Sequence, residues 1–333
     1  RPKNIGVGFN AGMSITSGIN NNIIGTFAGD ALTDADDNIV LGSVALSTDT
    51  KGSRSVAIGT DALRYQNFTT STNSYNIAIG YAAGTNISTG TENTFIGSLA
   101  GDGTQTGIQN VAVGQEALSA VAGNTNTAVG TFSLNVCTGS DNTAVGMLAG
   151  GSLTSGSNCL FVGHDAGRSG SPGGNITTAS NLLALGDENI SNAYIAVDWT
   201  VTSDQRDKTD FTALDVGLDF VNALKPVTYK WDKRSKYGDK TADDYDLNNI
   251  TTDGTHKEDW LDIGFKAQEV EALEKAAGYK ISDKTNLTTS LTEDGKQYGI
   301  QYAKFVPILV KAIQELTAAN TALTARVKTL EDG

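Results

Sequence analysis

Short apolar stretches with an alternating pattern recur along the first 190 residues of the chain. The clearest copies lie at 55–59, 76–80, 110–114 and 142–146, and each reads polar, β-branched, Ala, apolar, Gly. Alternation with a period of two is typical of a half-buried β-strand, with Ala on one face and its apolar neighbours on the other. The Asn that opens most copies favours an Asx-type turn, and the closing glycine permits positive φ. The pattern predicts one short strand per repeat.

The spacing of these repeats is nearly constant. The anchor glycines are Gly8, Gly25, Gly42, Gly59, Gly80, Gly97, Gly114, Gly130, Gly146, Gly163 and Gly186. Successive steps measure 16 or 17 residues, except for one step of 21 and one of 23. A fixed period predicts a parallel β-solenoid, here of about eleven turns, in which each turn contacts only its neighbours. The two long steps predict surface insertions at residues 64–74 and 167–178.

The hydrophobic core of this solenoid is expected to be thin. Its inward candidates are Ala, Val, Ile and Leu, two or three per turn. Burial of each larger aliphatic side chain contributes about 1.5–3 kcal/mol, whereas ordering the backbone costs about 1–2 kcal/mol per residue. A single chain therefore looks marginal, and we infer a homo-oligomer. The face expected to meet other copies carries the Ala of the Ala-Leu or Ala-Gly pair that follows each anchor glycine.

A different pattern starts at Trp199. An amphipathic helix is predicted from apolar residues at helical spacing: Leu214, Leu218, Val221 and Leu224. The Lys-Pro pair at 225–226 ends this helix, and the alternating residues 227–231 predict a strand. Further elements are expected at 263–270 and 298–302. The second part of the chain therefore predicts an α+β domain.

The last 28 residues carry a heptad repeat that predicts a parallel coiled-coil helix. Its a positions are Val306, Ile313, Asn320 and Val327, and its d positions are Leu309, Leu316, Leu323 and Leu330. Asn320 is interpreted as a register-setting residue. Branched a residues with Leu at d favour two strands, but this seam is short and Pro307 limits its start. The number of strands therefore rests on the resemblances given below.

Composition supports a division of the chain near residue 200. The 333 residues carry a net charge of −13, yet residues 1–200 hold only 6 basic and 14 acidic side chains. We predict a repeat domain at 1–198, an α+β domain at 199–305 and a helix at 306–333. The acidic balance argues against nucleic acid as a partner, and no apolar run is long enough for membrane insertion. Two cysteines, Cys137 and Cys159, are expected to be buried thiols.

The repeat phrase Asn-x-Val-Ala-Ile-Gly-x-x-Ala resembles the head repeats of trimeric autotransporter adhesins, over about residues 4–190. This resemblance implies a left-handed parallel β-roll assembled as a trimer. The second part carries four markers: Ser-Asp-x-x-x-Lys at 203–208, Leu-Lys-Pro-Val-x-Tyr-x-Trp at 224–231, Gly-Phe-x-Ala-Gln-Glu-Val at 264–270 and Ala-Ile-Gln-Glu-Leu at 312–316. Together they resemble the C-terminal intramolecular chaperone domain of phage tailspikes and tail fibres, the endosialidase-type self-cleaving family. Both resemblances imply three chains.

In that family the first marker supplies a Ser–Lys dyad that cuts the chain before the serine. The resemblance implies that Ser203 is the nucleophile, Lys208 its general base, and Thr202–Ser203 the scissile bond. Serine needs a base to take its proton, and a desolvated lysine can do so. A separation of five residues does not align side chains on an α-helix, so a turn or a neighbouring subunit should complete the dyad. The alternative is that Ser203 caps a helix and Lys208 is solvated.

Other chemistry is poorly supported by the sequence. Asp34, Asp36 and Asp37 lack EF-hand spacing and suit a solvated loop better than a Ca²⁺ site. His164 and His256 have no Cys or His partner nearby in the sequence. A glycosidase needs paired carboxylates, and the few acids of the repeats lie mostly in loops. We expect no cofactor and no metal, and no enzyme activity beyond self-cleavage.

The patterns and resemblances together predict a structural tail-fibre protein of a phage, located in the virion. Its C-terminal domain would drive trimer assembly and then cut itself off. The expected partners are two further copies of the chain, the rest of the fibre at the N-terminal end, and a glycan or protein receptor on the host cell. The alternative is a bacterial surface adhesin that retains its C-terminal domain as a trimeric tip. A polysaccharide-degrading tailspike is a third class.

Overall fold

The computed structural model describes residues 3–240, 242 and 244–333. Its described residues fall into two compact units. Unit 1 comprises Arg1–Ile190 with Gly238–Leu247, and unit 2 comprises Ser191–Tyr237 with Asn248–Gly333. The domain boundaries after residues 198 and 305 stay predictions.

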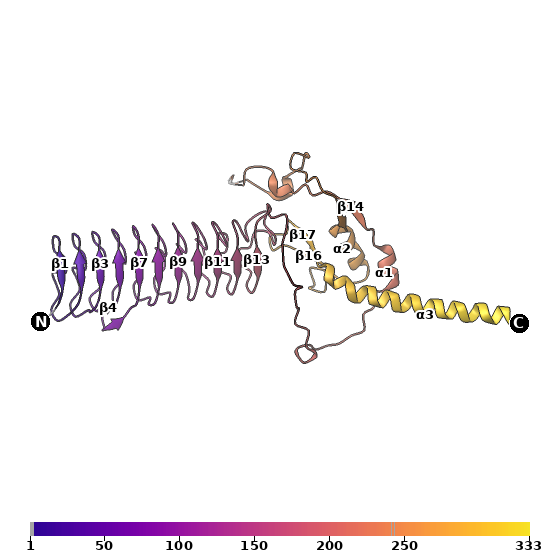
Figure 1. Ribbon diagram of the computed structural model, residues 1–333, viewed down its shortest axis with the longest axis horizontal. Helices are drawn as coiled ribbons and strands as arrows, with labels where there is room; N and C mark the ends of the chain where they lie inside the picture. Colours follow the sequence, from indigo (N-terminus) through magenta and orange to yellow (C-terminus); the bar gives the residue numbers. More distant parts are fainter. Residues whose placement is uncertain (1–2, 241, 243) are drawn as a thin grey trace. The chain divides into compact units, whose positions relative to one another are not determined.

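Unit 1 contains one parallel sheet with a strand for every repeat, and the strands stack in chain order (Figure 1). Each strand pairs in register with the next, so that Ala57 lies beside Ala78. The eleven strands are β1 Ile5–Val7, β2 Asn22–Ile24, β3 Ile39–Leu41, β5 Val56–Ile58, β7 Ile77–Ile79, β8 Thr94–Ile96, β9 Val111–Val113, β10 Thr127–Val129, β11 Thr143–Val145, β12 Leu160–Val162 and β13 Leu183–Leu185. The predicted parallel β-solenoid is confirmed.

The anchor glycines are required by the close approach of successive turns. Gly59, directly after β5, has φ of +131°, and a Cβ placed there would lie 2.3 Å from the carbonyl oxygen of Gly80 in the next turn. Any other residue would combine an unfavourable φ with a backbone clash. This geometry explains why glycine closes each repeat.

A ladder of buried asparagines runs along the solenoid, one residue before most strands. The Asn38 side chain donates to Asn21 Oδ1 at 3.0 Å and to the Gly52 carbonyl at 3.0 Å. Asn21 Oδ1 also accepts from the Asn38 backbone N–H at 3.0 Å. The other fully buried members are Asn76, Asn93, Asn110, Asn126 and Asn142. Each amide satisfies backbone groups that the narrow turns leave without a ladder partner.

The ladder is interrupted at Ser55, and the 64–74 insertion repairs it there. Ser55 occupies an asparagine position, and its hydroxyl is too short to span the gap to Asn76. Gln66, from the insertion, donates to Ser55 Oγ at 3.0 Å and accepts from Asn76 Nδ2 at 2.8 Å. The same insertion carries β6 Thr72–Asn73, which pairs with β4 Gly52–Ser53. The 21-residue step therefore supplies the missing amide.

The core of unit 1 lies inside the single chain, and this corrects one expectation. The Ala residues of the Ala-Leu and Ala-Gly pairs, such as Ala62 and Ala83, are fully buried without any partner copy. These alanines belong to the same core cluster as the strand alanines Ala57 and Ala78. The prediction that the face carrying these alanines meets other copies was therefore wrong.

The apolar surface that one chain leaves uncovered lies instead on the outer side of the strands. First and third strand positions point outward, while the central residue is buried in each strand of the large sheet after β1. Leu41 and Leu185, for example, are 45% and 48% exposed. The other large exposed residues of this strand face are Ile5, Val7, Ile24, Ile39, Ile79, Ile96, Val145, Leu160, Val162 and Leu183. A continuous strip of this kind is typical of an interaction surface.

Unit 2 contains short elements around a small core formed by Val216, Phe220, Val270, Phe305 and Ile308. Its two antiparallel strand pairs are β14 Val227–Tyr229 with β15 Asp262–Gly264, and β16 Thr289–Leu291 with β17 Tyr298–Ile300. Its α-helices are α1 Leu218–Ala223, α2 Ala267–Ala276 and α3 Phe305–Glu331. The 3₁₀ helices are η1 Gln205–Asp207, η2 Arg234–Lys236, η3 Leu247–Asn249 (of which Leu247 belongs to unit 1) and η4 Tyr302–Lys304.

The first helix is shorter than predicted. Leu214 and Leu224 lie outside α1, which begins after Gly217. The cause is tertiary, because the backbone N–H of Leu218 donates to Glu315 Oε2 of α3 at 2.7 Å. This contact fixes the helix start at a residue that helical spacing alone does not mark.

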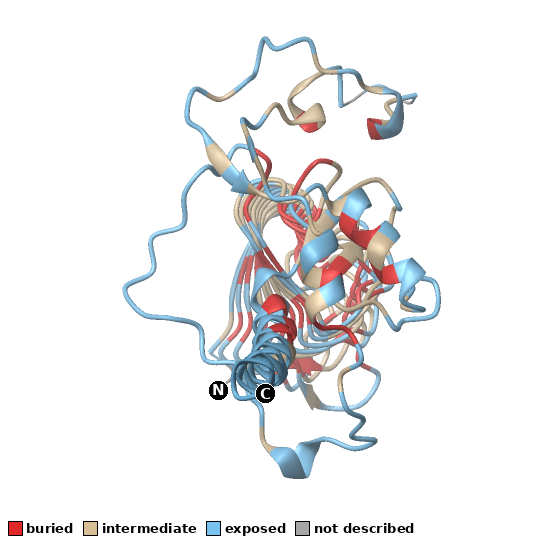
Figure 2. Cartoon of the chain, turned by 90° about the vertical axis from the view of Figure 1, so that its right-hand side faces the viewer, coloured by how far each residue is buried: buried red, intermediate tan, exposed pale blue. Residues whose placement is uncertain are grey.

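Helix α3 exposes the predicted seam. Phe305, Ile308 and Ala312 are buried against unit 2, whereas Ile313 and Leu316 are 63% and 55% exposed. Figure 2 shows the helix as exposed over most of its length. The heptad side chains thus form a second strip that this chain does not cover.

Cys137 and Cys159 are buried free thiols, as predicted. None of the helices in the described part of the chain has the length and apolar character of a membrane span.

Candidate active site

The two predicted site residues lie together in a turn. Lys208 Nζ donates to Ser203 Oγ at 2.5 Å and to the Ser203 carbonyl oxygen at 3.3 Å. Between them the chain forms η1, after which the Lys208 backbone N–H donates to the Gln205 carbonyl at 3.2 Å. The tight 3₁₀ turn brings two side chains together that an α-helix would separate.

Asp204 holds this turn in place. Its carboxylate caps η1 by accepting from the Arg206 backbone N–H at 2.9 Å, and the Arg206 guanidinium binds it at 2.6 Å. Hydrogen bonds from the Arg206 side chain, and then from its backbone, lower the pKa of Asp204. The N-cap is therefore Asp204, so the alternative with Ser203 as the cap is wrong. Asp204 belongs to the motif and Arg206 stands at one of its variable positions; both hold the turn, a role that the sequence did not indicate.

The dyad is exposed in the single chain. Thr202, Ser203 and Lys208 are all on the surface. A lysine accepts a proton only in its neutral form, and that form is favoured by removal from water. The arrangement places the Lys208 amine beside the Ser203 hydroxyl and next to the Thr202–Ser203 peptide bond. The catalytic roles of Ser203 and Lys208 stay predictions.

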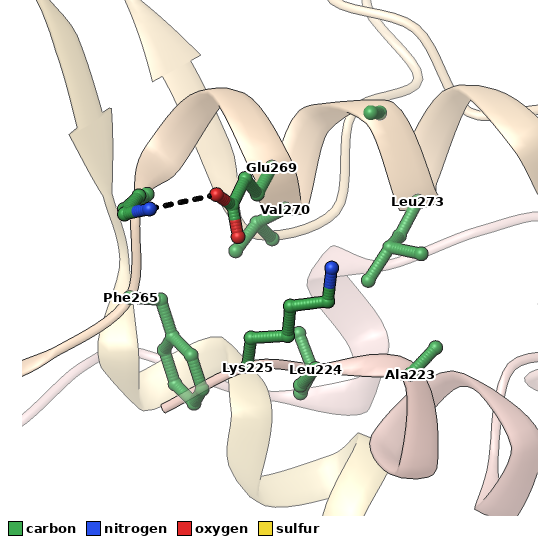
Figure 3. Close-up of a pocket in the computed structure, with 9 residues that line it drawn as sticks. Ala223, Leu224, Lys225, Phe265, Glu269, Val270 and Leu273 are labelled. Atoms are coloured by element: carbon green, nitrogen blue, oxygen red, sulfur yellow. Dashed lines mark hydrogen bonds and ion pairs between the residues drawn. The ribbon is translucent and has the colours of Figure 1, made fainter. Parts of the chain in front are cut away.

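Two of the other sequence markers meet at a pocket in unit 2 (Figure 3). The pocket has a volume of about 220 Å³. Leu224 and Lys225 line it from the Leu-Lys-Pro-Val motif, and Phe265, Glu269 and Val270 line it from the Gly-Phe-x-Ala-Gln-Glu-Val motif. Both motifs therefore line the space between the end of α1 and α2, and neither lies in the Ser203 turn.

A buried carboxylate that sequence reasoning missed ties α2 to β16. Glu274 is fully buried and accepts from the backbone and hydroxyl of Thr288 at 2.7 and 2.6 Å. It also accepts from the Thr289 hydroxyl at 2.7 Å and from the Leu287 N–H at 3.2 Å. Burial raises its pKa, but these bonds outweigh burial and leave the pKa below its usual value. The sequence did contain a signal for this carboxylate. Glu274 comes four residues after Val270 and therefore lies on the apolar face of the helix.

Comparison with protein families gives one match. Residues 203–279 match the family model described as chaperone of endosialidase. The match begins at Ser203 and includes Lys208, both pocket-lining motifs and α2. The matched residues make up under a quarter of the chain. No curated protein and no solved structure matches the chain. A chaperone-of-endosialidase domain that follows a parallel β-solenoid fits a tail-fibre-like protein.

Proposed function

We propose that this chain is a structural tail-fibre protein of a phage whose C-terminal domain directs trimer assembly and then releases itself by cleaving between Thr202 and Ser203. One observation carries the proposal. The family match begins at Ser203, and the Ser203 hydroxyl lies 2.5 Å from the Lys208 amine. In this account the solenoid is the part that stays in the virion, with the rest of the fibre at its N-terminal end and a host receptor as its target.

Two uncovered apolar strips support assembly from several copies. One runs along the outer face of the strands, and the other is the α3 seam, with Leu323 and Leu330 at 59% and 81% exposure. Association of identical chains covers each of these strips, since each copy presents the same residues to the next. Three copies agree with both family resemblances.

The proposed reaction uses groups already beside one another. Ser203 Oγ attacks the carbonyl carbon of Thr202, and its proton passes to the Lys208 amine. The C–N bond of the Thr202–Ser203 peptide breaks, its nitrogen takes the proton from Lys208, and the Thr202 acyl group remains as an ester on Ser203 Oγ. Water then hydrolyses the ester. The products are a carboxylate at Thr202 and a chain that starts with Ser203.

The exposure of the dyad gives the reaction its timing. Lys208 is exposed in an isolated chain, and lysines that act as general bases in proteins are withdrawn from water. Assembly brings neighbouring chains over the turn and removes water from it. Cleavage thus follows assembly, and a fibre loses its chaperone only when its register is set.

Four variants test the dyad, with cleavage followed by electrophoresis. Ser203→Ala and Lys208→Ala should remain full length, because each removes one partner. Lys208→Arg keeps the positive charge and the length, but its guanidinium does not give up a proton near neutral pH, so it should also remain intact. Ser203→Cys should still cut, because a thiol is also a nucleophile.

Thr209→Ala, next to the turn, is the matched control and should cut as the wild type does. Cleavage in Lys208→Arg at the wild-type rate would overturn the role given to Lys208. Intact wild-type trimers would favour the second candidate, an adhesin with a retained tip, which the resemblance of the repeats to adhesin heads supports.

A further inference from the structure

The segment just before the proposed cleavage site has an alternating pattern of its own. Ile195, Val197, Trp199 and Val201 are 53%, 75%, 69% and 80% exposed. Ala, Asp and Thr stand between them at residues 196, 198 and 200. A row of large apolar side chains on one face and small or polar ones on the other is the pattern of a half-buried strand.

The backbone of this segment is also without a partner in the single chain. Residues 195–201 form no helix or strand, and they make no backbone–backbone hydrogen bond to another residue that the structure describes. Extended segments with open N–H and C=O groups pair readily with other strands. Residues 195–201 therefore have both an apolar face and free backbone groups that a partner strand could cover.

We propose that residues 195–201 of three copies associate into a collar, with Val197, Trp199 and Val201 facing a common axis. The collar closes the end of the solenoid next to the scissile bond. This inference rests on the proposed trimer and adds to it a specific contact surface. After cleavage the collar stays with the solenoid part and becomes its C-terminal seal.

Continuity with the other uncovered strips identifies the occupant as a second and third copy. Leu185, the last exposed residue of the strand face, lies only ten residues before Ile195. Once copies associate along the strand face, their tethered segments meet at a high effective concentration. Each chain supplies a single apolar row, and three such rows around a symmetry axis would form a shared apolar core.

The pocket in unit 2 is a poorer fit. Six residue steps of an extended chain span about 20 Å, and the alternating row is spread over that length. A pocket of about 220 Å³ lined by Phe265 and Val270 accepts one such side chain and leaves the others in water. Insertion of Trp199 there is the competing outcome.

Cysteine cross-linking distinguishes these occupants. Val197→Cys places a thiol in the apolar row, and Thr200→Cys places one on the opposite face as the matched control. The native Cys137 and Cys159 are buried and leave little background. Both variants are oxidised as assembled proteins, and their oligomeric state is measured by light scattering before electrophoresis without reductant.

The collar predicts a disulfide-linked pair of chains in Val197→Cys that holds about two thirds of the chains, since three cysteines near one axis form one bridge. In Thr200→Cys the linked fraction should be at least about ten-fold lower, because its thiols point away from the axis. The cross-link should remain on the product that ends at Thr202.

A trimer with no bridge in Val197→Cys, or with equal bridging in both variants, would overturn the collar and leave the proposed function standing. A monomer in both variants and in the wild type would overturn the collar together with the proposed trimer.

Discussion

Replacement of Glu274 by Gln tests whether one buried carboxylate holds unit 2 together. Both oxygens of Glu274 accept hydrogen bonds from the segment that begins β16. An amide keeps one acceptor oxygen but puts an NH₂ group against the donors on the other side. The Leu287 N–H, now 3.2 Å from Glu274 Oε2, then loses its acceptor.

The size of the effect follows from those contacts. An unsatisfied buried donor costs about 1–3 kcal/mol, and loss of charge from the remaining bonds adds about 1 kcal/mol. Glu274→Gln should therefore lower the free energy of unfolding of unit 2 by about 2–4 kcal/mol. Glu269→Gln, on the exposed face of the same helix, should leave the free energy of unfolding almost unchanged.

Urea denaturation followed by tryptophan fluorescence measures the change, because Trp231 and Trp260 belong to unit 2. The lowered pKa of Glu274 also predicts a pH dependence. A carboxyl group with a lowered folded pKa stabilises the fold above its unfolded pKa, and this stabilisation is lost as pH falls through the folded pKa.

Wild-type stability should therefore fall on acidification below about pH 4.5, and the fall should be smaller in Glu274→Gln. Equal denaturation midpoints for the two proteins at pH 7, or equal slopes in acid, would refute the reasoning.

The other predictions concern assembly and the repeat core. Ile313→Asp puts a charge in the α3 seam and should abolish both the trimer in light scattering and cleavage on gels. Ala318→Asp, outside the seam, should alter neither. Cleavage by monomeric Ile313→Asp would contradict the dependence of cleavage on assembly. Asn110→Ala removes the acceptor 2.9 Å from the Asn126 N–H and the donor 2.9 Å from the Gly123 carbonyl, so calorimetry should show unfolding of the solenoid made easier by about 2–4 kcal/mol. An unchanged melting temperature would mean that the ladder is dispensable.

The solenoid was predictable because its constraints are local and repeated. Gly59 and its equivalents are needed wherever the turns approach, and Asn38 and its equivalents are needed wherever backbone groups are enclosed. The outward face was not predictable in the same way. Alternation shows that Val56 and Ile58 share a side of the strand, but only the return path of the chain decides which side becomes enclosed.

In unit 2 the local signals were weaker than the tertiary ones. The spacing of Ser203 and Lys208 predicted a turn, and the structure has one. The start of α1 depends on Glu315, which lies 97 residues away from Leu218. The exposure of the dyad depends on the whole surface around it. No sequence pattern contains these two facts.

The intact mass of the assembled wild-type protein tests the central claim most directly. The uncut chain has a mass of 34.7 kDa. The proposed reaction predicts two products from trimeric protein, one that ends in a free carboxylate at Thr202 and one that begins with a free amine at Ser203. A single species of 34.7 kDa that persists in a folded trimer would contradict the account.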